Sequence, residues 1–188
     1  AEEKIAPVVS KYDISGEFPW EIMKICAQTD MFRVFIPEEY GGLGGGVFEM
    51  ALVTEELSKV CGGIALGYAA TGLGAMPIIL FGNEEQKKEY LSRVAEGTIC
   101  AFALTESEAG SDASNMKTTA EKDGGYYVLN GTKQWITNGG EADIYTVIAM
   151  TDKSKGSRGA TAFIVEKGTP GFSFGVKEDK MGIRGSTT

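Results

Sequence analysis

The sequence predicts an α+β protein in which an all-helical half, residues 1–97, precedes an antiparallel β half, residues 98–188. Two observations predict this order. Apolar residues recur with helical spacing in the first half, whereas the second half alternates β-branched and aromatic runs with Asn-Gly turn signals. With 188 residues, of which 43% are hydrophobic and 23% charged, the chain is large enough to bury a core in each half.

Two helices of the first half can be placed from residue spacing. In the first helix, Phe48, Leu52, Glu55 and Lys59 fall on one side. The second helix, over residues 84–91, is amphipathic, and Asn83 can cap its N-terminus. Because glycine readily adopts the left-handed conformation that ends helices, Gly97 is expected to stop it.

Residues 60–82 contain no charged side chain and are long enough in principle to cross a bilayer. However, the segment has no basic flank and no aromatic belt. We therefore expect a buried helix instead of a membrane span, in which small residues let neighbouring helices approach closely. Its helix-breaking or small residues include Gly62, Gly63, Gly67, Gly72, Gly74 and Pro77.

Strands are predicted over residues 126–129, 133–137, 144–150, 160–165 and 172–176. The first two runs are followed by Asn130-Gly131 and by Asn138-Gly139-Gly140, which supply the positive φ angles that tight reversals need. The next two runs are apolar or β-branched. In the last run, Phe172, Phe174 and Val176 alternate with small residues, as in a half-buried strand.

The composition excludes several classes of function. The 18 Lys and Arg against 26 Asp and Glu give a net charge of −8 without a basic cluster, which argues against nucleic-acid binding. The absence of histidine excludes a Ser-His-Asp triad, a Cys-His pair and His-ligated zinc or iron within this chain. Cys26, Cys61 and Cys100 are dispersed, so we expect buried thiols in a reducing compartment and no metal site. The start carries no secretion signal and is expected to be a truncation.

The first stretch that could carry chemistry is residues 103–112. Its strand ends near Thr105, and a turn of small residues then presents Gly110, Ser111 and Asp112. Such a turn exposes N–H groups and a hydroxyl, which suits a phosphate, a pyrophosphate or a polarised carbonyl. Taken alone, however, the residues favour an ordinary strand exit with a local Asx or ST turn.

Two further stretches leave alternatives open. In residues 131–140, Trp135 could stack on a planar cofactor while Thr137 reaches a ring heteroatom, or it could be a core tryptophan. Residues 180–188 form a basic loop punctuated by glycine. This loop could hold an anion, or it could turn between strands.

In this order, the three stretches resemble the acyl-CoA dehydrogenase family. They are similar to its Leu-Thr-Glu…Gly-Ser-Asp, Trp-Ile-Thr-Asn-Gly and Lys-x-Gly-x-Arg-Gly-Ser segments, and residues 36–42 and 77–87 are also typical of it. Ser107 stands where the family usually has proline, and Asn115 where it usually has a small residue. Both departures lie in the loop expected on the CoA side.

The resemblance implies a β-barrel-like middle domain, a C-terminal helical bundle domain that is absent from this chain, and FAD in an extended cleft. Thr105 would bond the flavin's pyrimidine edge, Trp135 would lie against the isoalloxazine, and Thr137 would bond near N5. Gly110 and Ser111 would contact the ribityl and pyrophosphate region. Ser111 would also face the pantetheine, and Ala69 and Leu73 would line the acyl-chain tunnel. The full implied set of FAD contacts is Phe102, Leu104, Thr105, Gly110, Ser111, Trp135, Ile136 and Thr137.

The implied reaction oxidises an acyl-CoA to the trans-2-enoyl-CoA by α-proton abstraction and β-hydride transfer to flavin N5, with electrons passing to an electron-transferring flavoprotein. The glutamate base is expected after Thr188, so no residue of this chain is assigned to catalysis. The resemblance also implies a homotetramer in fatty-acid β-oxidation, in the bacterial cytoplasm or the mitochondrial matrix. Alternatives are a related acyl-CoA oxidase, a nitroalkane oxidase, a flavin monooxygenase and a flavin-free interaction module.

Overall fold

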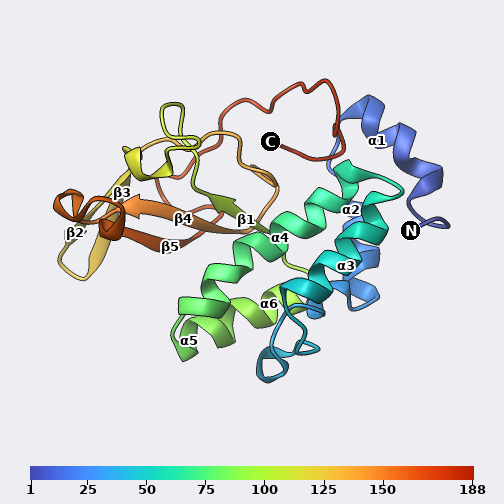
Figure 1. Cartoon of the computed structure of the whole chain (residues 1–188), viewed down its shortest axis with the longest axis horizontal. Helices are drawn as coiled ribbons and strands as arrows, with labels where there is room; N and C mark the ends of the chain where they lie inside the picture. The colour runs from blue at the N-terminus through green and yellow to red at the C-terminus, as the bar shows by residue number, and fades with distance from the viewer.

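Helices fill the first half of the chain and strands the second, which confirms the predicted order (Figure 1). The computed structural model describes all residues, 1–188. The helices are η1 Ala6–Val8, α1 Val9–Ser15, α2 Trp20–Gln28, η2 Met31–Arg33, η3 Glu38–Tyr40, α3 Val47–Ser58, α4 Gly62–Phe81, α5 Glu84–Gln86, η4 Lys87–Leu91 and α6 Ser92–Ala95. The second half contains β1 Cys100–Ala103, η5 Ala113–Asn115, β2 Thr119–Asp123, β3 Tyr126–Asn130, β4 Ile144–Met150, η6 Lys153–Gly159 and β5 Ala160–Glu166.

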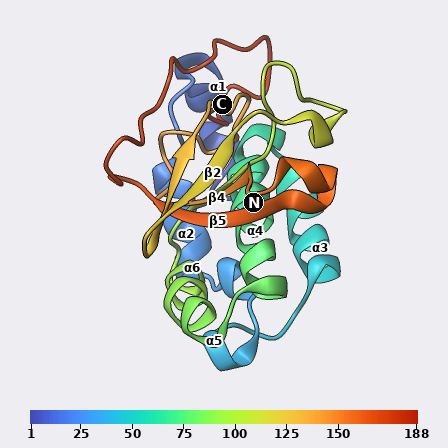
Figure 2. The same ribbon diagram turned by 90° about the vertical axis from the view of Figure 1, so that its left-hand side faces the viewer.

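Helix α4 lies between the other helices and the sheet. It packs on α2 and α3 on one side and on β1 and β4 on another, and Figure 2 shows the strands lying over the layer that contains α2 and α4. Its length and composition alone would suit a membrane span, but 56% of its most apolar 18-residue window is buried inside the protein. The approach to β1 requires Gly74, because a Cβ at this position would lie 2.8 Å from Cys100 Cβ. The helix is therefore the central element of the core.

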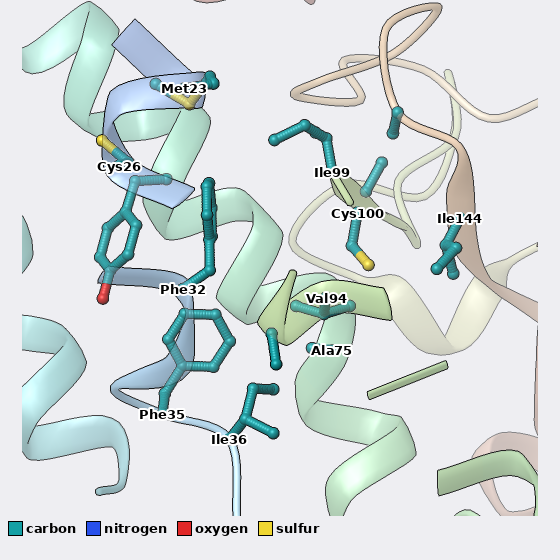
Figure 3. Packing of buried hydrophobic residues seen from close by; sticks show 14 of the residues in the cluster. Met23, Cys26, Phe32, Phe35, Ile36, Ala75, Val94, Ile99, Cys100 and Ile144 are labelled. Atoms are coloured by element: carbon teal, nitrogen blue, oxygen red, sulfur yellow. The ribbon is translucent and has the colours of Figure 1, made fainter. Parts of the chain in front are cut away.

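One apolar core joins the two halves. The cluster contains 27 buried side chains and runs from the N-terminal helices through α4 into β1 and β4. Figure 3 shows Phe32 and Phe35 on the helical side, with Cys100 and Ile144 on the strands beyond Ala75. At roughly 25 cal/mol per Å² of buried apolar surface, a continuous cluster of this kind is the main favourable contribution to folding.

The helical segment after α4 begins and ends as predicted. The Asn83 side chain accepts a hydrogen bond from the Gln86 backbone N–H at 2.8 Å, and the Gln86 side chain accepts one from the Asn83 N–H at 3.0 Å. This reciprocal pair is a capping box, which satisfies two N–H groups that have no partner within the helix. Beyond α6, Gly97 has φ +104° and turns the chain toward β1.

The sheet has five strands in the order β1-β4-β2-β3, with β5 pairing on β4. Pairs β2–β3 and β4–β5 are antiparallel, whereas β4 runs parallel to β1 and, through Met150 and Thr119, to the start of β2. The expectation of wholly antiparallel pairing is therefore corrected to a mixed sheet. The long connection from residue 104 to residue 143 lets β4 return in the direction of β1, which a tight hairpin cannot do.

Strands β4 and β5 confirm the predictions over 144–150 and 160–165, but the strands predicted over 133–137 and 172–176 are wrong. In the first, Trp135 has φ +60°, so the backbone cannot stay extended. In the second, the alternating Phe172 and Phe174 pack against Tyr145, with ring centroids 4.9 and 5.5 Å away, and they belong to no strand. The β2–β3 hairpin turns at Gly124-Gly125, and Asn130-Gly131 ends β3.

Candidate functional site

A groove of about 290 Å³ opens between α4, the end of β1 and the 131–143 loop, which joins β3 to β4. We call it the α4 groove. Eight residues predicted for the site meet here, although they come from three separate parts of the sequence. They are Ala69, Leu73, Phe102, Leu104, Thr105, Trp135, Ile136 and Thr137.

The wall contributed by α4 consists of four apolar residues on one face of the helix. Besides Ala69 and Leu73 it contains Leu66 and Ala70, which were not predicted as site residues. The four residues are related by steps of three and four along the helix, so they share one face. This spacing was available in the sequence and could have identified Leu66 and Ala70 once Ala69 and Leu73 had been chosen.

Trp135 is the largest side chain of the opposite wall. Its φ of +60° is uncommon for a residue other than glycine, and the residue is 55% exposed. The Gln134 N–H donates a hydrogen bond to the Thr105 carbonyl at 2.8 Å, which brings this wall alongside the end of β1. The indole is thus presented at the groove, and the alternative of a core tryptophan is not supported.

Asn138 anchors the far end of the same segment and is fully buried, with φ +64°. Its Nδ2 donates to the carbonyls of Gly67 at 3.1 Å and Cys100 at 2.9 Å, so one amide joins α4 to β1. Its backbone N–H donates to the Thr187 carbonyl at 3.1 Å. The Asn138 side chain thus keeps residues 135–137 in the wall of the groove, because it fixes the position of the residue that follows them.

Glu106 and Lys133 form a buried ion pair beside the groove. The Lys133 Nζ donates to Glu106 Oε1 at 2.7 Å and to the Leu104 carbonyl at 2.9 Å. Burial by itself would raise the pKa of the Glu106 carboxyl. The hydrogen bonds from Lys133, from the Thr118 hydroxyl and from the backbone N–H groups of Lys117 and Thr118 prevail and lower this pKa to about 2. Glu106 is therefore ionised and already bonded, so it is not available as a proton acceptor near neutral pH.

Gly110 and Ser111 do not line the α4 groove. Both are exposed in the loop between β1 and β2, and their assignment to the cofactor and the pantetheine stays a prediction. The loop begins with two backbone hydrogen bonds between Glu106 and Ala109, and the Ser114 hydroxyl donates to Asp112 Oδ1 at 2.7 Å. This last contact joins two side chains and is not an Asx or ST turn, which needs a backbone N–H donor, so the predicted local turn is not seen.

The basic loop near the C-terminus ties the two ends of the chain together. Arg184 donates to the carbonyls of Asp13 and Ile14 after the segment passes from the sheet back toward α1 (Figure 1). Lys177 bonds the Gly16 carbonyl, and Lys180 bonds the Ser186 carbonyl. Lys177, Lys180 and Arg184 are all hydrogen-bonded to carbonyl groups of the chain itself. These bonds favour a structural role for the segment over an anion-binding site.

The cysteines and acidic residues offer no second centre. Burial raises the pKa of the Cys26 thiol to about 11 and that of Cys100 to about 12, so both stay protonated and poorly nucleophilic. All three cysteines are free thiols. No group of three or more His, Cys, Asp or Glu side chains is placed to hold a metal ion.

Two family models match the chain in succession. Residues 1–98 match the model described as "Acyl-CoA dehydrogenase, N-terminal domain", and residues 101–188 match "Acyl-CoA dehydrogenase, middle domain". The chain is also 50% identical over 193 residues to the "Acyl-CoA dehydrogenase, short-chain specific" of Megasphaera elsdenii, which covers all of this chain and 50% of that protein.

Solved structures give the same likeness. One is titled an electron transferring flavoprotein of Acidaminococcus fermentans, with TM-score 0.93 and 48% identity over 98% of this chain and 50% of that one. Another is an acyl-CoA dehydrogenase complexed with FAD from Bacillus anthracis, with TM-score 0.80 and 43% identity over 89% of this chain and 28% of that one. The chain spans about half the length of the curated relatives it matches.

Proposed function

The chain belongs to the acyl-CoA dehydrogenase family, and we propose that the protein containing it binds FAD in the α4 groove and oxidises an acyl-CoA to the trans-2-enoyl-CoA. One observation carries the proposal beyond family membership. Trp135 is held in a left-handed conformation, largely exposed, at a groove that also contains Thr105 and Thr137. Strained, exposed aromatic residues tend to lie at ligand sites, because packing alone does not require them.

The residues of the groove fit a flavin ring. Eight of the ten lining residues are apolar, which suits the faces of a planar aromatic system, and the indole of Trp135 can lie against one face. Thr105 and Thr137 lie on the two neighbouring segments that line the groove, and their hydroxyls would bond heteroatoms at the ring edges. The groove volume of about 290 Å³ lies at the lower end of the roughly 300–1,000 Å³ usual for small-molecule pockets, so we propose that it takes the flavin ring alone. The rest of FAD would extend beyond it, toward Gly110 and Ser111.

When bound, a flavin supplies a two-electron acceptor for the substrate's β-hydride at N5. The chain's own residues prepare the groove for that chemistry. Thr105 and Thr137 would donate hydrogen bonds that favour added electron density at the ring. Leu66, Ala69 and Leu73 would keep water away from the reacting carbons, since their face of α4 is apolar.

We propose that the α-proton is taken by a glutamate from outside the residues described here. None of the ten residues that line the groove carries a carboxylate. Glu106 lies beside the groove, but its carboxylate already accepts hydrogen bonds from Lys133, Lys117 and Thr118 and is not free to take a proton. The groove would thus position the substrate, and another part of the protein would supply the base.

The relatives suggest which substrate and acceptor to test first. The Megasphaera elsdenii relative is named for short-chain substrates, and a neighbouring structure is titled an electron transferring flavoprotein. We propose a short-chain acyl-CoA and an electron-transferring flavoprotein as the partners of this protein, which would act as a homotetramer. A reducing compartment, bacterial cytoplasm or mitochondrial matrix, is proposed because all three cysteines are free.

The direct test is the colour of the purified full-length protein. We expect a yellow preparation whose flavin absorbance bleaches when butyryl-CoA is added without oxygen. A colourless protein that takes up no added FAD would overturn the proposal in favour of a flavin-free module. Stopped-flow mixing of the reduced protein with air then separates a dehydrogenase, which reoxidises slowly, from an oxidase.

A matched pair of tryptophan variants locates the flavin. Trp135→Ala should weaken FAD binding about tenfold, because stacking of a nucleobase on an aromatic side chain contributes about 1–3 kcal/mol and the flavin ring offers a similar planar face. Trp20→Ala is the control, since Trp20 lies on α2 and bonds Glu141 outside the groove. Equal FAD affinities for the two variants would place the flavin elsewhere.

A further inference from the structure

Two segments that line the α4 groove, residues 104–105 and 133–137, run side by side without forming a sheet. Leu104 and Thr105 follow β1, and residues 133–137 lie next to them, but neither segment is part of a strand. The backbone hydrogen bond from Gln134 N–H to the Thr105 carbonyl is the single main-chain link between them. Unlike neighbouring strands, they have no ladder to fix their separation, so side chains must fix it.

Lys133 and Glu106 supply that link. The Lys133 ammonium spans the gap and bonds both the Leu104 carbonyl and the Glu106 carboxylate. Glu106 is bonded in turn to the N–H groups of Lys117 and Thr118, and to the Thr118 hydroxyl, at the start of the next segment. The Lys133 side chain is 9% exposed and that of Glu106 is 6% exposed, so water competes little for these bonds.

Burying both charges is a costly way to gain stability alone. An apolar pair of similar volume often stabilises a core as well or better, because it avoids the desolvation of two ions. What the ion pair adds is geometry, since a short, charge-assisted bond tolerates little displacement. Each partner also adjoins the groove: Leu104 and Thr105 directly precede Glu106, and Trp135 follows Lys133 by two residues.

We propose that Lys133 and Glu106 are positioning residues that set the spacing between the Thr105 and Trp135 walls of the α4 groove, and thereby its affinity for flavin. Neither residue lines the groove, so both act through their neighbours. This inference rests on the proposed flavin function, but it fails separately from it: a wild-type protein that binds no FAD refutes the function, whereas unaffected variants refute only the positioning role.

The experiment uses the full-length protein and measures FAD affinity, the visible circular dichroism of bound FAD, and the unfolding midpoint of the flavin-free form. The variants are Lys133→Met, Glu106→Gln and the two combined. Lys59→Met is the control, because Lys59 directly follows α3, pairs with the exposed Glu55 and Glu56, and does not line the groove.

We expect the double variant to regain much of the stability lost in Lys133→Met, because it leaves no buried unpaired charge. Its FAD dissociation constant should nevertheless stay at least tenfold above that of wild type, with altered visible circular dichroism. Lys59→Met should match wild type in both flavin measurements. A double variant that binds FAD with wild-type affinity and spectrum would overturn the proposal. If Lys133→Met fails to fold, Glu106→Gln decides alone: we expect at least a threefold loss of affinity, and unchanged affinity and dichroism would be the contrary result.

Discussion

Replacing Asn138 by alanine tests how the groove-lining loop is held in place. The substitution removes an amide that is fully buried, together with its bonds to the Gly67 and Cys100 carbonyls. It also leaves alanine at φ +64°, a conformation that asparagine tolerates far better. Both effects act on the folded state, and a second substitution at the same position can remove the backbone strain while keeping the loss of hydrogen bonds.

The expected loss in the free energy of unfolding is about 3 kcal/mol. Each of the two lost hydrogen bonds to carbonyls is assigned about 1 kcal/mol, the usual net contribution of a buried bond between neutral groups, and the long 3.4 Å contact with the Thr71 hydroxyl is not counted. The Gly67 carbonyl keeps a bond from the Thr71 hydroxyl at 2.9 Å, so a larger penalty for an unsatisfied group is not added there. The left-handed backbone adds about 1 kcal/mol for alanine. For a chain of this size, the sum corresponds to a fall in Tm of roughly 6–12 °C.

Thermal and urea unfolding of the flavin-free protein, followed by far-UV circular dichroism, measure this loss. Asn138→Gly is the matched variant, because glycine removes the same hydrogen bonds but accepts positive φ without strain. It should lose about 2 kcal/mol. A Tm within 2 °C of wild type for Asn138→Ala, or a glycine variant clearly less stable than the alanine variant, would refute the reasoning.

Three further predictions concern packing, pH and specificity. Gly74→Ala should lower the free energy of unfolding, measured by urea titration, by about 1 kcal/mol or more. The new Cβ would lie 2.8 Å from Cys100 Cβ, and this overpacking outweighs the gain in helix propensity. Gly62→Ala is the control and should lose no stability, because the space around its Cβ is open. The pKa of Glu106 falls from 4.5 to about 2 on folding, so about 3 kcal/mol of stability should be present above pH 4.5 and disappear as the pH falls to 2. The difference in unfolding free energy between wild type and Glu106→Gln should therefore narrow over that range, and a constant difference would contradict it. Ala69→Leu should reduce kcat/KM for long acyl-CoAs relative to short ones by about tenfold, because it fills the α4 wall, and an unchanged length preference would contradict this role.

Helix caps and strands that depend on neighbouring residues could be predicted from the sequence. Asn83 lies at the capping position that its side chain chemistry predicts, and the apolar run over 144–150 forms β4, which its pattern predicts. The uncharged run over 60–82 contains the core helix α4, because its glycines permit the close contacts that a buried helix needs. These outcomes depend on interactions within a few residues or on burial of a whole face, and both are visible in one stretch of sequence.

Long-range packing set the conformation of the segments whose local sequence signal was incomplete. Residues 133–137 have the composition of a strand, but Lys133 and Asn138 bond distant carbonyls, and the backbone turns at Trp135 to satisfy them. The buried Lys133–Glu106 pair joins residues 27 positions apart, and the α4 groove joins residues from three segments. The residue pattern alone was enough to predict the order of helices and strands and the residue types that could form a site. Which polar groups become buried together depends on the packing of the whole chain, so the shape of the groove was settled only there.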